Sequence, residues 1–99
     1  MLHIVNKSPS QTCTLASCLR LAQPGSAVLL IEDGVYAATK GNADASALHA
    51  ACGRLQVYAL QPDCDARGIT ALLSEGITLV DYGGFVDLVA QRKTTHSWL

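Results

Sequence analysis

Residues 27–31 read Ala-Val-Leu-Leu-Ile and form the longest continuous apolar run of this 99-residue chain. A short apolar run between turn signals is typical of a strand that is buried on both faces, as in a parallel sheet. Pro-Gly at 24–25 precedes the run, and Glu-Asp-Gly at 32–34 turns the chain out of it. The run therefore predicts a buried strand of a parallel sheet.

Strand and helix signals alternate along the rest of the chain. Short β-prone runs predict strands at residues 2–5, 55–60 and 77–80, and the tail at 96–99 predicts an edge strand. Helices are expected at 8–22, 44–52 and 82–93, with a short helical turn at 35–40 and a helical stretch at 62–73 that is interrupted near Gly68.

Several helix ends carry recognisable signals. Ser8, followed by Pro9 and by Gln11 three residues after the cap, predicts the start of the first helix. Gly53 ends the second helix, and Asp81 is the expected cap of the last one, with a close glycine contact. That last helix should carry its apolar side chains on one side and end in two basic residues that favour the helix dipole. The apolar residues are Phe85, Val86, Leu88 and Val89, and the basic ones are Arg92 and Lys93.

Strands that alternate with helices of this length imply right-handed β-α-β crossovers. We therefore expect an α/β fold, a single domain over residues 1–99, with a mostly parallel sheet of about four to five strands covered by helices on both faces.

The composition favours association. Hydrophobic residues make up 49% of the chain and charged residues 15%, whereas a domain near this size buries only roughly 60–70% of its unfolded surface. We therefore expect the isolated chain to self-associate and a partner interface that includes Tyr36 and Phe85.

Two classes of partner lack support. The net charge is −1 and the basic residues are scattered, so no basic stripe favours direct nucleic-acid binding. No apolar run approaches the roughly 20 residues of a membrane span, and the N-terminus lacks the features of a signal peptide. We expect a cytoplasmic protein without membrane association.

The four cysteines are Cys13, Cys18, Cys52 and Cys64. In the cytoplasm they are expected to be thiols. The absence of a C-x-x-C spacing, and histidines far from ligand spacing, argue against a metal site or a thioredoxin-type pair. Helical periodicity places Cys18 at the edge of an apolar stripe and Cys13 almost opposite. Either one could be a small packing residue, and no cofactor is expected.

The acidic residues Glu32 and Asp33 follow a buried strand, at the end where open α/β sheets usually bind ligands. A turn or helix-capping role for Asp33 is the alternative. Neither a phosphate loop nor a Ser-His-Asp arrangement is present in recognisable form. The residues alone indicate no reaction.

Three longer segments resemble the TusB/DsrH family. They are Met-Leu-His-Ile-Val-Asn-Lys-Ser-Pro at 1–9, Leu-Leu-Ile-Glu-Asp-Gly-Val-Tyr-Ala-Ala at 29–38 and Val-Asp-Tyr-Gly-Gly-Phe-Val-Asp-Leu at 80–88. Residues 58–60, Asp63, residues 66–68 and Trp98 fit the same pattern in the same order. The resemblance covers essentially the whole chain.

The resemblance implies a DsrE-like three-layer α/β/α sandwich. It also implies assembly with TusC/DsrF-type and TusD/DsrE-type subunits into a heterohexamer that holds two copies of each. Such complexes pass persulfide sulfur to a TusE/DsrC-type carrier, and the principal sulfur-bearing cysteine belongs to the TusD/DsrE-type subunit. This chain is thus expected to be a non-catalytic or accessory subunit of a sulfurtransferase complex.

The resemblance also places a DsrH-type cysteine at Cys18, which makes this thiol a candidate for sulfur handling or for contact with the carrier. In the Tus branch the sulfur ends in 2-thiouridine at the tRNA wobble position, and in the Dsr branch the relay serves oxidation of stored sulfur. We place tRNA thiolation first. A thiol enzyme that uses Cys18 and an interaction module without sulfur chemistry are the alternatives.

Overall fold

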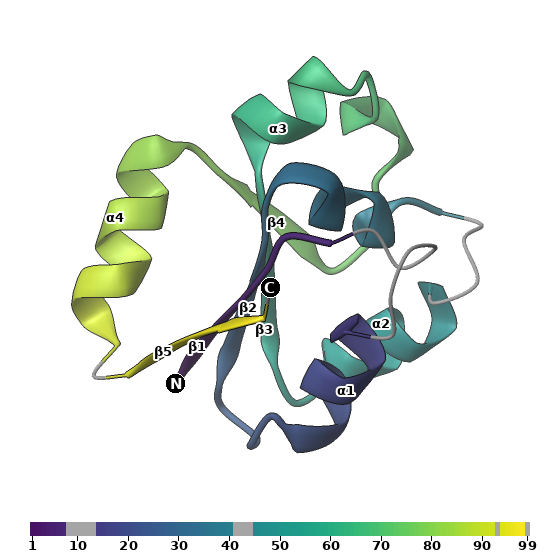
Figure 1. The fold of residues 1–99 in the computed structure, drawn as a ribbon. Coiled ribbons are helices and arrows are strands. Elements are labelled where there is room, and N and C mark those ends of the chain that lie inside the picture. Colours follow the sequence, from purple (N-terminus) through teal and green to yellow (C-terminus); the bar gives the residue numbers. More distant parts are fainter. Residues whose placement is uncertain (8–13, 41–44, 93, 99) are drawn as a thin grey trace.

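A computed structural model describes residues 1–7, 14–40, 45–92 and 94–98, without the side chains of residues 14–16 and 45–47. Its centre is a five-stranded parallel sheet in the order β4-β3-β2-β1-β5 (Figure 1). The strands are β1 (Leu2–Val5), β2 (Ala27–Leu30), β3 (Gln56–Leu60), β4 (Ile77–Val80) and β5 (Thr95–Trp98). The predicted parallel sheet is confirmed, including a C-terminal strand at one edge.

Strand β2 lies in the middle of the sheet, between β1 and β3. All of its residues are fully buried, because strands flank it on both sides and helices cover both faces. This confirms the expectation for residues 27–31. The strand ends at Leu30, and Ile31 is the first residue of the connection to the next helix.

The helices lie on both faces of the sheet, and Figure 1 shows α4 on one side with α1 and α2 on the other. They are α1 (Thr14–Leu21), α2 (Ala45–Ala51), α3 (Gln61–Ala66) and α4 (Tyr82–Gln91), and two 3-10 helices, η1 (Glu32–Ala38) and η2 (Thr70–Leu72). The arrangement is the predicted three-layer α/β/α sandwich. None of the described helices is long and apolar enough to cross a membrane.

Two hydrophobic clusters fill the spaces between the layers. Successive side chains of a strand point to opposite faces, so Val5, Val28 and Leu30 join the larger cluster with residues of α1, η1, α2 and α3. Leu2 and Leu29 point the other way and pack with Leu88 of α4 in the smaller cluster. The larger core therefore rests on several helices, whereas the smaller one rests on α4.

The end of α1 is closed by a side chain from far along the chain. Arg54 donates from Nη2 to the Leu19 carbonyl at 2.7 Å and from Nη1 to the Ala22 carbonyl at 3.1 Å. The last carbonyls of a helix have no partner within it, and a cation there also suits the dipole. The guanidinium thus fixes α1 against the connection that leads into β3.

The start of α4 follows the expectation. The Asp81 carboxylate accepts a hydrogen bond from the Gly84 amide at 2.7 Å, as an N-cap should. A Cβ at Gly84 would lie 3.0 Å from Cβ of Val80, which is the expected close glycine contact. Because Gly84 and Leu88 lie one turn apart, both face the sheet.

Two expectations about α4 need correction. Its apolar residues do not share one side, since Leu88 is buried and Phe85 half-buried whereas Val86 is 64% exposed. The close fit at Gly84 sets the rotation of the helix and turns Val86 outward. Arg92 does not bind the end of α4; its guanidinium donates to the Gly25 carbonyl and to Gln56 Oε1.

Other boundaries differ in smaller ways. The helical turn expected at 35–40 is η1, which already begins at Glu32. The stretch expected at 62–73 is split into α3 and η2, and Gly68 between them has a φ of 67°, a conformation that suits glycine. The predicted helix start at Ser8, Pro9 and Gln11 lies outside the described residues, as do Cys13 and Lys93.

Candidate functional site

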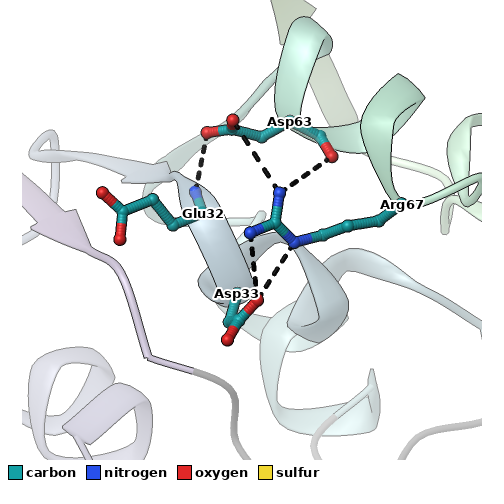
Figure 2. Close-up of polar contacts among 4 residues, drawn as sticks. All are labelled: Glu32, Asp33, Asp63 and Arg67. Carbon is teal, nitrogen blue, oxygen red and sulfur yellow. Dashed lines mark hydrogen bonds and ion pairs between the residues drawn. The ribbon is translucent and has the colours of Figure 1, made fainter.

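Polar side chains gather beyond the carboxyl ends of β2 and β3, where η1 and α3 begin. Glu32 and Asp33 stand in the first turn of η1, and Asp63 stands in the first turn of α3. Arg67 follows α3 as its C-terminal cap. Figure 2 shows the Arg67 guanidinium between Asp33 and Asp63, with Glu32 beside them. Open α/β sheets bind ligands at this end of their strands, so we take these residues as the candidate site.

Gly34 allows η1 to lie this close to the sheet. A Cβ at this position would collide with the backbone carbonyl of Val5 at the end of β1. The same carbonyl accepts a hydrogen bond from the Ile31 amide at 3.0 Å. Residues 31–34 are therefore held against the end of β1, and this fixes where Glu32 and Asp33 project.

Arg67 links the two helices through their carboxylates. Its Nε and Nη2 atoms both lie 3.0 Å from Oδ1 of Asp33. Its Nη1 donates to the backbone carbonyl of Asp63 at 3.3 Å and lies 3.8 Å from that residue's Oδ1. One guanidinium thus contacts both η1 and the first turn of α3 (Figure 2).

The backbone of Glu32 completes the cluster. Its amide donates to Oδ2 of Asp63 at 2.7 Å, and its φ of 49° places it in the left-handed region, which is uncommon for a residue with a side chain. The hydrogen bond that the Glu32 amide donates to Asp63 helps to hold this conformation. The Glu32 carboxylate extends away from the guanidinium (Figure 2).

The contacts of the cluster hold η1 and α3 in position relative to each other. Two carboxylates, of Asp33 and Asp63, contact one guanidinium, and the Glu32 carboxylate extends away from it, so this edge carries excess negative charge. The Asp33 side chain is 48% exposed and that of Arg67 24%, and such partly exposed pairs contribute about 0–1 kcal/mol each. Among the described residues, no group of three or more His, Cys, Asp or Glu side chains could hold a metal ion.

Cys64 directly follows Asp63 in the sequence, which places a thiol beside the cluster along the chain. It is fully buried in the larger core. Burial raises the pKa of this thiol, the carboxylates of Asp63 and Asp65 raise it further, and the Arg67 guanidinium lowers it. Thiol chemistry requires the thiolate, so the site does not activate Cys64.

The comparisons with known proteins cover nearly the whole chain and indicate one family. A family model described as "DsrH like protein" matches residues 7–95. The chain belongs to the DsrH/TusB family. Protein TusB of Serratia proteamaculans is 40% identical over 98 residues, which cover 99% of this chain and 100% of that relative. Protein TusB of Escherichia coli (strain K12) is 41% identical over 98 residues, which again cover 99% of this chain and 100% of the relative.

Solved structures share the fold at lower identity. The YchN protein of E. coli superposes with a TM-score of 0.81 at 18% identity, covering 97% of each chain. A protein from Methanobacterium thermoautotrophicum gives a TM-score of 0.77 at 19% identity, covering 97% of this chain and 95% of that one. These likenesses show that the DsrH/TusB chain has the fold of these neighbours.

The thiol that the family resemblance singles out is Cys18. It lies in α1 with no exposed surface, inside the larger core rather than at its edge. Burial raises the pKa of the Cys18 thiol to about 11. Cys52 is half-buried, its pKa is raised by burial, and its Sγ donates to the Gly76 carbonyl at 3.7 Å. Sulfur handling by Cys18 stays a prediction, and its surroundings are those of a packing residue.

The two predicted interface residues differ in exposure. Tyr36 of η1 is 38% exposed. Phe85 is half-buried against the smaller core, while its neighbours Tyr82, Val86 and Val89 are exposed by 62%, 64% and 39%. These three residues, spaced by four and three, form one face of α4, which we call the α4 outer stripe.

Sequence reasoning missed two features of this family member. It did not pair Asp33 with Arg67, although Asp63 and residues 66–68 were among those that carry the family resemblance. It also expected the exposed apolar face at Phe85 rather than at the α4 outer stripe. A helical wheel started from Gly84, the residue that touches β4, would have found the stripe.

Proposed function

We propose that this chain is an accessory subunit of a sulfur-relay complex that serves tRNA thiolation. The observation that carries the proposal is the match of about 40% identity to proteins named TusB, over essentially the full length of both chains. In this role it assembles in the cytoplasm with TusC- and TusD-type subunits, two copies of each. The complex passes persulfide sulfur to a TusE-type carrier for 2-thiouridine at the wobble position.

The thiols support an accessory role. In the part of the chain that the structure describes, Cys18 and Cys64 are fully buried, and burial raises the pKa of Cys18, Cys52 and Cys64. A relay thiol must reach its partner and ionise near neutral pH, which usually needs a partly exposed, electropositive setting. This agrees with what the family resemblance implies, namely that the principal persulfide forms on the TusD-type subunit.

The α4 outer stripe, with Phe85 beneath it, supports a partner-binding role, and Tyr36 is the proposed contact on η1. The exposure of Tyr82, Val86 and Val89 leaves apolar area that a partner can remove from water. Fully burying an apolar side chain of this size contributes about 1.5–3 kcal/mol. Charged side chains are absent from the three positions, as is common in the core of an interface.

The decisive experiment co-expresses the chain with TusC- and TusD-type subunits and examines the product by native mass spectrometry. We expect a complex with two copies of each subunit and, after incubation with a persulfide donor, added sulfur on the TusD-type subunit. Cys18→Ser tests the thiol directly, and Cys52→Ser is the matched control. Unchanged transfer in both variants supports the accessory role. Loss of transfer in Cys18→Ser alone, with the complex intact, would establish a working thiol instead.

The alternative is the Dsr branch, because the family model carries the DsrH description. Deleting the gene separates the two pathways. We expect 2-thiouridine to disappear from the tRNA of the deletion strain and to return when the gene is restored. Normal thiolation in the deletion strain would rule out the tRNA pathway and favour oxidation of stored sulfur.

A further inference from the structure

Three aromatic side chains meet where β5 pairs with β1 at one edge of the sheet. These two strands come from opposite ends of the sequence. The register places His3 opposite His96 and Val5 opposite Trp98. The indole Nε1 of Trp98 donates a hydrogen bond to Nδ1 of His3 at 3.1 Å. The His96 and Trp98 ring centroids lie 4.7 Å apart, and the His3 ring lies 6.2 Å from His96 and 6.1 Å from Trp98.

The hydrogen bond fixes the protonation state of His3. An indole nitrogen is only a donor, so the ring nitrogen that faces it must carry no proton. Neutral His3 meets this condition with its proton on the other nitrogen. A protonated imidazole donates from both nitrogens, and its Nδ1–H would then point at the Trp98 N–H. The contact therefore exists only with neutral His3.

The surroundings of His3 also favour its neutral form. His3 is 5% exposed, and its pKa is lowered by burial, by His96 and by the N-terminal ammonium. On the other side of β1, the residues of β2 are all apolar. The described side chains of α1, which packs against β1 and β5, include two titratable groups, the buried Cys18 thiol and the exposed Arg20 guanidinium. Within these described parts of β1, β2, β5 and α1, no carboxylate compensates a charge on His3.

Strand β5 has few other attachments. It lies at the edge of the sheet and, among the described strands, pairs only with β1. Thr95, His96 and Ser97 are exposed, and Trp98 is the β5 side chain packed against the larger core. The residue that anchors the strand in the core is thus the one that depends on neutral His3.

We propose that the His3–Trp98 contact is a proton-sensitive latch, which holds β5 on the sheet when His3 is neutral and releases it when His3 is protonated. The pKa of His3 is lowered in the latched state, so His3 stabilises that state at pH values above 6.5, the pKa of a free histidine. The stabilisation is lost as the pH falls below that value toward the lowered one. Each unit of lowering changes the opening equilibrium by about tenfold once the pH is below both values.

Amide hydrogen exchange of the full chain, followed by NMR, measures the opening of the latch through the protection of a single hydrogen-bonded amide. The Leu2 amide donates to the Thr94 carbonyl at 3.0 Å, across the seam between β1 and β5. The Gln56 amide donates to the Ser26 carbonyl at 3.0 Å, across the seam between β3 and β2, and is the internal control. Between roughly pH 7.5 and 5, the range in which histidine titrates, protection of Leu2 should fall several-fold relative to Gln56.

Two matched variants test the cause. His3→Gln stays neutral and its amide oxygen can accept from Trp98, so the pH response should disappear. His49→Gln makes the same change at an exposed histidine of α2 and should keep the response. A response that persists in His3→Gln would overturn the latch.

A measurement on the unsubstituted chain guards against misfolding of the variant. The chain has a single tryptophan, so its indole N–H signal is unambiguous. We expect that signal and the His3 ring signals to change over the same pH range as the protection of Leu2. An indole signal and a Leu2 protection that both stay constant through the titration of His3 would also overturn the proposal.

Discussion

The two faces of the sheet are closed in different ways. The face of Val28 and Leu30 is covered by α1, η1, α2 and α3, and its cluster reaches into each of these helices. The opposite face of Leu2 and Leu29 is covered by α4, which buries Leu88 but leaves its outer stripe exposed. Several helices of this chain cover the first face, whereas the second leaves apolar side chains of α4 exposed, and these form the surface that we propose for partner binding. The chain therefore combines a well-covered core with a core that is covered by one helix.

The largest effect on the free energy of unfolding is expected when a leucine is truncated to alanine on each of the two faces. Leu30→Ala should lower the free energy of unfolding by about 3–5 kcal/mol, and Leu88→Ala by about 2–3 kcal/mol. Leu30 is fully buried in the middle of the sheet, so the structure cannot close around the cavity. Leu88 lies on a helix with one open side, which can move inward. Urea unfolding followed by circular dichroism measures both, and an equal or greater loss for Leu88→Ala would contradict the comparison.

Gly34 joins the better-covered face to the candidate site. Gly34→Ala should cost about 1–3 kcal/mol, because the new methyl group collides with the Val5 carbonyl and pushes η1 from the end of β1. Gly53→Ala is the matched control, since its Cβ would meet the nearest atom at 3.5 Å, an ordinary contact. If both substitutions had the same effect on unfolding, the close approach at Gly34 would not matter for stability.

The Arg67 cluster should contribute less than either core. Arg67→Met removes the guanidinium that links Asp33 and Asp63, and we expect a loss of about 1 kcal/mol because both pairs are partly exposed. Salt should reduce the difference, since screening weakens exposed ion pairs. Arg20→Met, at an exposed arginine of α1, is the control. Urea midpoints at low and high salt check this, and equal losses in the two variants would deny the cluster a special role.

The sequence predicted the elements better than their contacts. The run at 27–31 identified the buried strand because parallel strands hide both faces and need apolar residues throughout. Asp81 was recognised as a cap because its partner, Gly84, lies three residues away. Local patterns of this kind are present in the sequence itself.

Contacts between distant segments were not predictable in the same way. Asp33 and Arg67 meet across 34 residues, and His3 and Trp98 across 95. Both contacts depend on the order of the strands and on how each helix lies against the sheet. The family resemblance pointed to Asp63, Arg67 and Trp98 without saying what they touch.

The smallest effect on stability is expected at Val86. A substitution there also tests the α4 outer stripe most directly as a partner surface. Val86→Ser should change the free energy of unfolding of the isolated chain by no more than about 0.5 kcal/mol, because the side chain is 64% exposed. In the complex with TusC- and TusD-type subunits, the same change should weaken binding by about tenfold, which is the loss expected when one apolar side chain of an interface is removed. Titration of the chain into the other two subunits measures this.

Leu72→Ser is the matched control for the substitution in the α4 outer stripe. Leu72 is 55% exposed on η2, so the substitution removes similar apolar surface from a different part of the molecule. We expect its binding to match that of the unsubstituted chain. Weaker binding of Leu72→Ser with unchanged binding of Val86→Ser would move the interface from α4 to η2. Equal weakening of both would mean that partners cover both regions, and the two faces would then differ only in how much of their core this chain supplies.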